Sequence, residues 1–430
     1  MESLILGLFL AQLIACLALG IDLLWALSVG YVLFWGYGVL RGHGPLGVVK
    51  MSLGGIGKVK NVLITFIFIG MLTATWRASG TLAAIICYAA RAIRPDIFLL
   101  LTFLLNCGVS FLTGTAFGTS ATMGMVCMTM AAAMGLSPVL TGGAILAGSF
   151  FGDRCSPVST SALLVSEVTG TDLFRNLKNM MKSCAVPFAL SCGVYLAAGF
   201  LRPAQETALD IHSLFSAAFA IHPAALIPAA VILGLSAARV NVKRSIASSA
   251  AAAAVLCLAL QGMTPAALLR CLVLGFHTAD PVLEAMLGGG GIVSMVRVGA
   301  IVCLSSSYAG IFEGTGLLTG VQSAIARLGR RTFPFLATVL TAALTSMVAC
   351  NQTLAIMLTQ QLCGELEPDK ETFALDLEDS VVVISPLVPW SIASAVPLAT
   401  VGAPTAAVAA ACYLYFLPLW RLFRRGRKQE

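Results

Sequence analysis

Residues Ile97 to Gly152 read IFLLLTFLLNCGVSFLTGTAFGTSATMGMVCMTMAAAMGLSPVLTGGAILAGSFFG, a run of 56 residues without Asp, Glu, Lys, Arg or His. A membrane-spanning helix needs about 20 apolar residues, so the run is long enough for more than one membrane-entering segment. Two further runs, 332–364 and 380–420, are also free of charged residues. The pattern predicts an all-α integral membrane protein.

The composition of the whole chain agrees with this class. Of its 430 residues, 58% are hydrophobic and 10% are charged, whereas soluble proteins carry roughly 25% charged residues. Adding the apolar runs near 183–201, 211–236, 245–262 and 298–326 predicts roughly 11–13 membrane-entering segments. The N-terminus, MESLILGLFLAQ, has no basic leader and is expected to form the first span. The thirteen cysteines occur singly within apolar stretches, which is typical of small buried side chains, and no cofactor is expected.

Basic residues concentrate in segments beside the apolar runs, so the net charge of +7 does not indicate nucleic-acid binding. The positive-inside rule places such segments in the cytoplasm. It predicts a multi-pass protein of the cell membrane with both termini cytoplasmic. The lipid bilayer is its expected partner. The basic segments lie at 41–60, 239–244, 327–331 and 421–430.

The two halves of the chain repeat each other weakly. TATWRASGTL around Trp76 matches AGIFEGTGL around Phe312, SFLTGTAFGTS from Ser110 matches TSMVACNQTLA from Thr345, and SPVSTSALL from Ser156 matches SPLVPWSIA from Ser385. Because the three pairs keep their order and nearly constant separations, they indicate an inverted-repeat transporter. The expected organisation is an N-terminal helical hairpin with a cytoplasmic loop (1–60), a first repeat (61–200), connecting helices with an interfacial segment (201–297), a second repeat (298–420) and a basic tail (421–430).

The segment from Gly114 to Gly124 is a poor helix, since it has three glycines and four Ser or Thr residues. Irregular backbone at membrane depth persists only where protein or a water-filled cavity satisfies it. A broken helix would therefore direct its carbonyls and hydroxyls into a site. The alternative is tight helix packing by small residues. The similar segment Cys350-Asn351-Gln352-Thr353 in the second half favours the site.

In FGDRCSPVST, Asp153 and Arg154 end the longest uncharged run, and Ser156-Pro157 then breaks the helix. A carboxylate surrounded by hydroxyls suits a hard cation. It can hold a cation or a proton but rarely both, which is a simple basis for cation/proton exchange. The alternative places both charges at the membrane interface, where they cap a helix end.

Two further intramembrane charges, Arg77 and Glu313, stand at matched positions of the repeat. They are expected to pair across the pseudo-symmetry axis, or one of them contacts substrate. The acidic segment 365–379 is expected to face water.

These motifs, in this order, resemble the NhaC-type sodium/proton antiporter family, a branch of the ion transporter superfamily. The residues that carry the resemblance are Trp76…Gly80-Thr81, Gly114-Thr115…Gly118-Thr119, Gly152-Asp153…Ser156-Pro157…Ser159, GGGGIVSM ending at Met295, Gly316, Leu377-Glu378-Asp379 and Ser385-Pro386-Leu387…Pro389-Trp390.

The resemblance implies two inverted repeats, each with a re-entrant hairpin and a broken helix, together with transport and scaffold domains and a homodimer. Carried over by position, it implies an ion site built from polar residues of the hairpins and broken helices. The candidates, including those from the broken segments above, are Thr115, Gly118, Thr119, Asp153, Ser156, Ser159, Asn351, Thr353, Ser385 and Trp390.

The chain also departs from the family pattern. Where many members read SPLSDTTN, residues 156–163 read SPVSTSAL, without the second acidic residue and the asparagine. Where many read PWN, this chain has Pro389-Trp390-Ser391. The family also includes transporters of organic acids and of an aromatic amino acid, and Arg77 could bind a carboxylate in a bidentate manner.

Two transport functions follow, and an enzyme is not expected. The first is sodium/proton antiport by alternating access, in which Asp153 binds the cation and its protonation releases it. The second is sodium- or proton-coupled transport of a small organic acid or amino acid. An intramembrane protease would need a GxGD or GxSG motif, and GSFFGD at Gly148 to Asp153 has the wrong spacing.

Overall fold

The computed structural model describes residues 2–19, 21–89, 94–157, 159–201, 211–238, 240–317 and 334–426. Within these ranges the chain is helical and contains no β-strand; a single isolated β-bridge joins Phe276 to Gly289. The predicted all-α class is therefore confirmed. The prediction for Arg239 and for the segment 327–331 falls outside the described residues.

The first part of the chain, up to residue 201, supplies the N-terminal helices and half of the central bundle. Its helices are α1 (Glu2–Ala18), α2 (Leu23–Leu40), α3 (Pro45–Lys58), α4 (Lys60–Ala78), α5 (Thr81–Ala89), α6 (Pro95–Thr113), α7 (Ala116–Thr119), the π-helical turn η1 (Ser120–Gly124), α8 (Met125–Ala133), α9 (Pro138–Cys155), α10 (Thr160–Thr169) and α11 (Leu173–Leu201).

The second part consists of connecting helices and the other half of the bundle. Its helices are α12 (Ile211–Ala218), η2 (Pro223–Leu226), α13 (Ile227–Ala237), α14 (Val242–Ala259), α15 (Pro265–Leu274), α16 (Pro281–Leu287), α17 (Gly291–Ser294), α18 (Val296–Thr315), α20 (Pro334–Ala349), α21 (Gln352–Cys363), α22 (Lys370–Glu378), α23 (Val381–Ile384), η3 (Ser385–Leu387), α24 (Ile392–Val401), η4 (Thr405–Ala410) and α25 (Cys412–Gly426).

Several of these helices are suited to a membrane. By length and composition, three of the described helices could cross one: Pro95–Thr113, Ala116–Ala133 and Leu173–Leu201. Lys370–Leu387 and Ile392–Val401 form a further candidate span, bent by 53° at a short break. Other apolar helices of 10–17 residues accompany them. The chain is thus an all-α membrane protein, while the number of roughly 11–13 segments stays a prediction.

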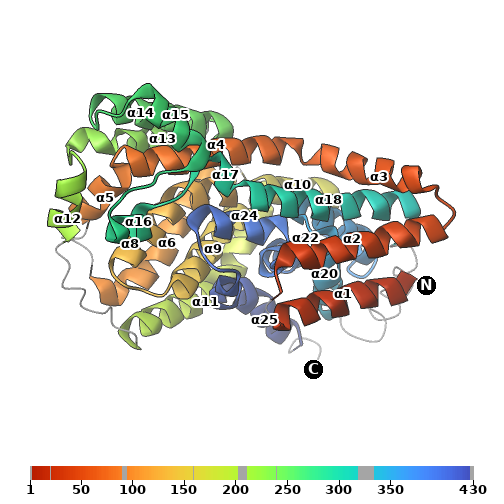
Figure 1. Cartoon of the computed structure of the whole chain (residues 1–430). Helices are drawn as coiled ribbons and strands as arrows, with labels where there is room; N and C mark the ends of the chain where they lie inside the picture. The colour runs from red at the N-terminus through yellow and green to blue at the C-terminus, as the bar shows by residue number, and fades with distance from the viewer. Residues whose placement is uncertain are drawn as a thin grey trace.

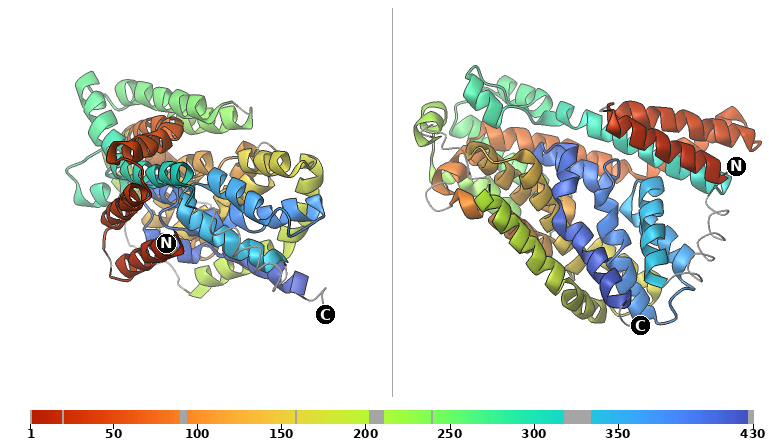
Figure 2. Two further views of the ribbon diagram at one scale, coloured as in Figure 1. Left: turned by 90° about the vertical axis from the view of Figure 1, so that its right-hand side faces the viewer. Right: turned by 90° about the horizontal axis from the view of Figure 1, so that it is seen from below.

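The helices form two groups. In the first, α18 packs along α2 and α3, while α4 packs against α14, α15 and α17. In the second, α6 packs against α9 and α11, and α25 against α9 and α11. The right-hand view of Figure 2 shows the red N-terminal helices beside α18 along one edge, with the yellow-green α11 along the opposite edge and the dark blue α25 running down to the C-terminus. Figure 1 shows α13, α14 and α15 together at one end of the molecule.

The stretch 41–60, expected to be a cytoplasmic loop, instead contains α3. Pro45 starts this helix, since its fixed φ and missing N–H suit the first helical position. Close packing against α18 then stabilises it: a Cβ added to Gly55 would lie 2.1 Å from the carbonyl oxygen of Ser306, and one added to Gly310 would lie 2.1 Å from that of Met51. Two glycines therefore bring the backbones of α3 and α18 into contact, as in other membrane helix pairs.

The matched motifs of the two halves have the same local backbone. Gly80 and Gly316, which follow α4 and α18, are both left-handed, with φ of 74° and 64°. Gly114 and Cys350, which follow α6 and α20, are also left-handed, with φ of 65° and 55°. Cys350 has the only positive φ among the non-glycine residues described. The predicted helix break at Gly114 is therefore present, and a similar break occurs in the second half.

Glycines also bring α6 and α9 together beside Asp153. A Cβ on Gly148 would lie 2.7 Å from the carbonyl oxygen of Phe103, and one on Gly152 would lie 2.1 Å from the carbonyl carbon of Ser110. The Ser110 hydroxyl donates to the carbonyl of Ser149 across the same contact. The C-terminal end of α9, which carries Asp153, can thus lie this close to α6 only because Gly148 and Gly152 have no side chains.

Replacing Gly152 with Ala is expected to destabilise the protein. The added methyl group overlaps the backbone of α6, so the helices must move apart, at a cost of about 1–3 kcal/mol in the free energy of unfolding. Thermal unfolding of the purified protein measures the change. Gly193→Ala, at an exposed position of α11 with no atom within 4 Å of the added carbon, is the control and should leave the melting temperature unchanged. Equal melting temperatures for both variants would contradict this account of the α6–α9 contact.

Candidate functional site

Four helices begin at one small cavity. Its volume is about 160 Å³, below the roughly 300–1,000 Å³ of pockets that hold drug-sized ligands. The first residues of α7, α10, α21 and α24 lie in its wall, together with the last turn of α9. The lining residues are Thr115, Ala116, Phe117, Phe150, Asp153, Thr160, Asn351, Gln352, Thr353, Ile392 and Ala393.

Two of the four helices begin after left-handed residues. Thr115 and Asn351 follow Gly114 and Cys350, and both are extended, with φ of −146° and −142°. The Thr115 hydroxyl accepts a hydrogen bond from the N–H of Gly118, 3.3 Å away. The Asn351 side chain accepts one from the N–H of Thr353, 2.9 Å away. The two residues thus cap α7 and α21, and the left-handed residues turn the chain back at the cavity.

The other two helices begin after Ser-Pro sequences. Ser159 and Ser391 have nearly identical φ, −69° and −70°, and their hydroxyls cap α10 and α24. Prolines at 157 and 386 prevent the preceding helices from continuing regularly. Three of the breaks therefore follow from local sequence, a glycine or a proline followed by a capping side chain, whereas at Cys350 a non-glycine residue adopts the left-handed conformation.

Asp153 is the charged residue in the wall of the cavity. Its side chain is buried, with 6% of the residue surface exposed. One carboxylate oxygen accepts hydrogen bonds from Gln352 Nε2 at 3.2 Å and Ser161 Oγ at 3.1 Å. The carbonyl oxygen of Asp153 accepts from the Ser159 and Ser161 hydroxyls. Asp153 is therefore packed inside the bundle and not exposed at a helix end.

The surroundings of Asp153 favour a negative charge there. The N-terminus of a helix carries a partial positive charge and free N–H groups, and four helices begin at this cavity. Their field offsets part of the cost of burying a carboxylate. An ionised carboxylate with hydroxyl and amide oxygens nearby is a suitable ligand set for a hard cation. The site can therefore hold a small cation, and the same carboxylate can bind a proton instead.

The structure brings only some of the predicted residues to the cavity. Thr115, Asp153, Asn351 and Thr353 line it. Ser159 does not line it but holds the Asp153 carbonyl through a hydrogen bond. The remaining candidates are buried residues that do not line the cavity: Gly118, Thr119, Ser156, Ser385 and Trp390.

Two of these residues make contacts that stabilise the fold. The Thr119 hydroxyl donates to the carbonyl of Thr115 at 2.9 Å. The indole N–H of Trp390 donates to the carbonyl of Met347 at 2.9 Å, and the ring packs in an apolar cluster with Cys350. The ion-binding roles assigned to them remain predictions.

Arg77 lies away from the cavity. Its guanidinium donates to the carbonyl of Gly288, and it interacts electrostatically with Glu284 at the other end of α16. Hydrogen bonds from the Thr278 N–H at 2.9 Å and from His277 at 2.8 Å hold the pKa of the Glu284 carboxyl below its ordinary value. Arg77 therefore fastens the segment around α16 to α4. The proposed partner Glu313 has its side chain outside the described residues.

Two residues that contact the Asp153 carboxylate were absent from the predicted set, namely Gln352 and Ser161. Both lie within motifs that the sequence singled out. Gln352 sits between Asn351 and Thr353, and Ser161 follows Ser159 and Thr160. The sequence identified the two segments. The spacing of their residues does not reveal which side chain in the first turn of each helix contacts the carboxylate.

Arg154 faces the opposite side of α9 from the cavity and is fully buried. It forms an ion pair with Asp379, and its Nη2 donates to the Ser183 hydroxyl at 2.8 Å. Arg421 on α25 contacts Asp376 at 2.7 Å and Asp379 at 3.4 Å. The expectation that the acidic segment 365–379 faces water is therefore wrong for its last turn. Arginines from α9 and α25 pair with its acids, which makes their burial tolerable.

Comparison with known proteins agrees with this architecture. The Na+/H+ antiporter family model matches residues 4–172 and 150–420. An uncharacterized Na+/H+ antiporter of Haemophilus influenzae is 27% identical over 86% of this chain and 83% of its own length. The malate-2H+/Na+-lactate antiporter of Bacillus subtilis is 27% identical over 90% and 85%. The Na+/H+ antiporter NhaC of Alkalihalophilus pseudofirmus is 25% identical over 78% and 74%. These matches confirm the resemblance to NhaC, and the chain belongs to the Na+/H+ antiporter family.

Proposed function

We propose that this protein is a secondary transporter that exchanges sodium for protons, with Asp153 as the shared binding site. The observation that carries the proposal is the meeting of four helix N-termini at a cavity whose wall holds one buried carboxylate. The positive helix ends support the ionised carboxylate, and the carboxylate binds either sodium or a proton. Family membership supports the same exchange.

The coupling follows from this competition. Sodium binds to the ionised form of Asp153, with Thr115, Asn351 and Thr353 as nearby oxygen donors. A proton arriving at the carboxylate removes the charge that holds sodium, so sodium leaves. Alternating access then requires the helices that begin at the cavity to move against the α1–α4 and α18 group. The packing of α18 along α2 and α3, and of α6 along α9 and α11, supports that division into scaffold and transport parts.

Two inverted repeats are part of the proposal. Their support is the agreement of the backbone at matched positions, Gly114 with Cys350 and Ser159 with Ser391. A homodimer, cytoplasmic termini and the division of the chain at residues 60, 200, 297 and 420 are proposed on sequence and family grounds.

Transport of a small organic acid is the second candidate. Helix N-termini bind anions readily, and the Bacillus subtilis relative is by name a malate and lactate antiporter. The cavity volume of about 160 Å³ would admit a small carboxylate but not a large one. Arg77 would not bind that carboxylate, since it contacts the carbonyl of Gly288 instead.

Thermal unfolding of the purified protein distinguishes the two functions. A ligand that binds only the folded state raises the melting temperature by mass action. Sodium alone should raise it, and acidification should remove the effect. Stabilisation that requires malate, lactate or an amino acid would favour the organic-acid transporter instead, and a melting temperature that none of these ligands changes would contradict both.

Replacing Gln352 with Ala should weaken sodium binding about tenfold, because a hydrogen bond to a charged group contributes roughly 1.5 kcal/mol. Gln352 donates to the Asp153 carboxylate at 3.2 Å and to the Val382 carbonyl at 3.0 Å, so its loss frees the carboxylate to move. Sodium titration of the melting temperature measures the affinity. Gln360→Ala, on the same helix and away from the cavity, is the control. Equal sodium affinity in the two variants would contradict a role for Gln352.

A further inference from the structure

Glu378 is the last residue of α22 and is a buried acid. It takes no part in the competition between sodium and a proton that is proposed at Asp153. The whole residue is 0% exposed. Neither of its carboxylate oxygens has a hydrogen-bond partner among the described residues. The neighbouring buried acids differ: Asp376 of α22 and Asp379, which directly follows the helix, both contact arginines. Buried carboxylates are normally paired, so an unpaired one calls for a chemical reason.

The charges around Glu378 do not include a cation of its own. Arg154 donates to the backbone carbonyl of Glu378, while its ion pair is with the Asp379 carboxylate. Arg421 pairs with Asp376, and Arg425 pairs with Glu367 at 2.8 Å. Among the described residues of this cluster, three arginines thus serve three other acids.

Among the residues that the structure describes, Glu378 and Asp153 remain as buried acids that form no ion pair with an arginine. The charged groups that interact with Glu378 are Arg154, Asp379 and Asp153. Tyr413 of α25 and Cys184 of α11 also interact with the Arg154–Asp379 pair. Because two like charges in a buried region repel each other, Asp153 and Glu378 cannot both be ionised at low cost unless a cation is present.

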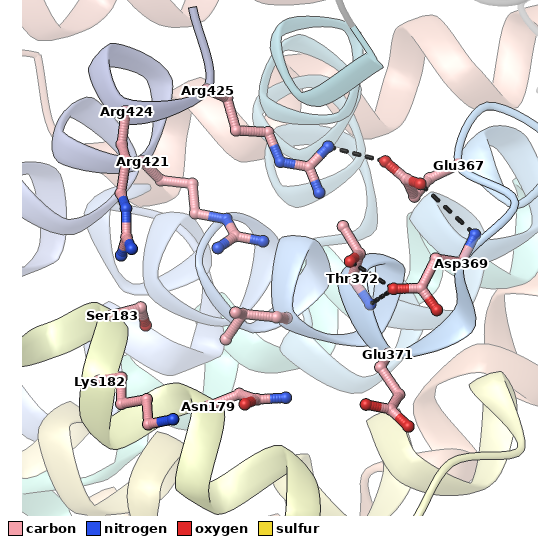
Figure 3. A pocket seen from close by; sticks show the side chains of 11 residues that line it. Asn179, Lys182, Ser183, Glu367, Asp369, Glu371, Thr372, Arg421, Arg424 and Arg425 are labelled. Carbon is pink, nitrogen blue, oxygen red and sulfur yellow. Dashed lines mark hydrogen bonds and ion pairs between the residues drawn. The ribbon is translucent and has the colours of Figure 1, made fainter. Parts of the chain in front are cut away.

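A polar pocket lies beside this cluster of acids and arginines. It has a volume of about 480 Å³ and lies between α11, α22 and α25 (Figure 3). Ser183 and Arg421 lie in its wall, and both contact Asp379, the residue next to Glu378. The pocket is lined by Asn179, Lys182, Ser183, Glu367, Asp369, Glu371, Thr372, Leu375, Arg421, Arg424 and Arg425. Glu378 does not line the pocket itself but is next in sequence to Asp379, which two wall residues contact.

We propose that Glu378 is a second proton-binding carboxyl of the transporter, which releases its proton to the polar pocket when a cation binds at Asp153. The proposal rests on the proposed sodium/proton exchange and adds a second acid to it. The step conserves charge and atoms: the O–H bond of the Glu378 carboxyl breaks, the proton passes to water in the pocket, and sodium brings the compensating positive charge.

The coupling is electrostatic. With the cavity empty, a charge on Asp153 repels a charge on Glu378, so Glu378 keeps its proton. Sodium at Asp153 cancels that repulsion and favours the ionised form of Glu378. Sodium binding should therefore release a proton from Glu378 even where Asp153 is already ionised and competition at Asp153 alone would release none.

The test counts the protons released when sodium binds to the purified full-length protein, with a pH-indicator dye in weakly buffered detergent solution. In the pH range where Asp153 is ionised and Glu378 is protonated, the wild type should release about one proton per sodium. Glu378→Gln should still bind sodium, with an affinity within about threefold of the wild type, and should release about one proton fewer. Glu167→Gln, an exposed acid of α10, is the matched control and should release as many protons as the wild type.

A purely structural role for Glu378 predicts a different result. In that case Glu378→Gln lowers the melting temperature and leaves the proton count unchanged, which would overturn the proposal. Our expectation is an unchanged or higher melting temperature, since no hydrogen bond is lost. If Glu378→Gln does not fold, Glu378→Asp keeps the acid: infrared difference spectra of sodium binding should then show the protonated-carboxyl band of the wild type shifted, and an unshifted band would overturn the proposal.

The same proton count distinguishes a failure of the proposed sodium/proton exchange from a failure of the role proposed for Glu378. If sodium binds to the wild type without any release of protons at any pH, sodium/proton exchange itself is wrong. If the wild type releases protons and Glu378→Gln releases the same number, exchange stands and only the role of Glu378 is wrong.

Discussion

Asp153→Asn is expected to abolish sodium-dependent proton movement while the protein still folds. The amide has nearly the same shape as the carboxyl and can keep the contacts with Gln352 and Ser161 after rotation. It has no negative charge, however, so it binds sodium weakly and cannot exchange sodium for a proton. Flux in proteoliposomes should fall to that of protein-free vesicles, and sodium should no longer raise the melting temperature.

Glu167→Gln is the matched control for this variant. Glu167 is an exposed acid of α10, a helix that begins at the same cavity, and its replacement should leave flux unchanged. Asp153→Asn protein must reach the membrane and elute from size exclusion like the wild type. Sodium-driven proton movement at the normal rate in such a preparation would show that the cation binds elsewhere.

Arg154→Met should cause the largest loss of stability of any single substitution discussed. Arg154 is fully buried and pairs with Asp379, so its removal leaves that buried carboxylate with only the longer contact to Arg421, at 3.4 Å. Breaking a buried ion pair in this way costs about 3–5 kcal/mol of unfolding free energy. It should appear as a lowered melting temperature and reduced yield. The side chain also bonds to Ser183 and to the Met180 carbonyl, which joins α9 to α11.

The double variant Arg154→Met, Asp379→Asn tests whether the isolated charge is the cause. Removing both charges should restore part of the stability, because a neutral pair is easier to bury than one charge. Arg175→Met is the control: Arg175 pairs with Glu371 at 2.8 Å but is 67% exposed, and exposed pairs contribute at most about 1 kcal/mol. A double variant less stable than Arg154→Met would contradict the expected compensation.

Local sequence predicts the helix breaks well. Gly114 and the Ser-Pro sequences at 156 and 385 disfavour a continuous helix whatever surrounds them, and Thr115, Ser159 and Ser391 are good capping residues. Their meeting at one cavity could be anticipated from the repeated motifs. Local sequence does not predict α3 at 45–58, since this helix depends on glycine contacts with α18, which is distant in sequence.

The electrostatics of the site could not be predicted in the same way. The acids of the segment 365–379 look water-facing in the sequence, but Arg154, Arg421 and Arg425 reach them from α9 and α25. The pairing of charges distant in sequence decides which acids are buried. Likewise, the sequence around Arg77 does not indicate that this residue contacts the carbonyl of Gly288 rather than the cavity.

The most direct test of sodium/proton exchange is a flux measurement on the purified protein in liposomes that contain a pH-sensitive dye. A sodium pulse outside the vesicles should make the lumen more alkaline, without any organic solute, and Asp153→Asn vesicles should show no change. A lumen pH that stays constant on sodium addition, and changes only when malate, lactate or an amino acid is supplied, would contradict sodium/proton antiport and identify an organic-solute transporter.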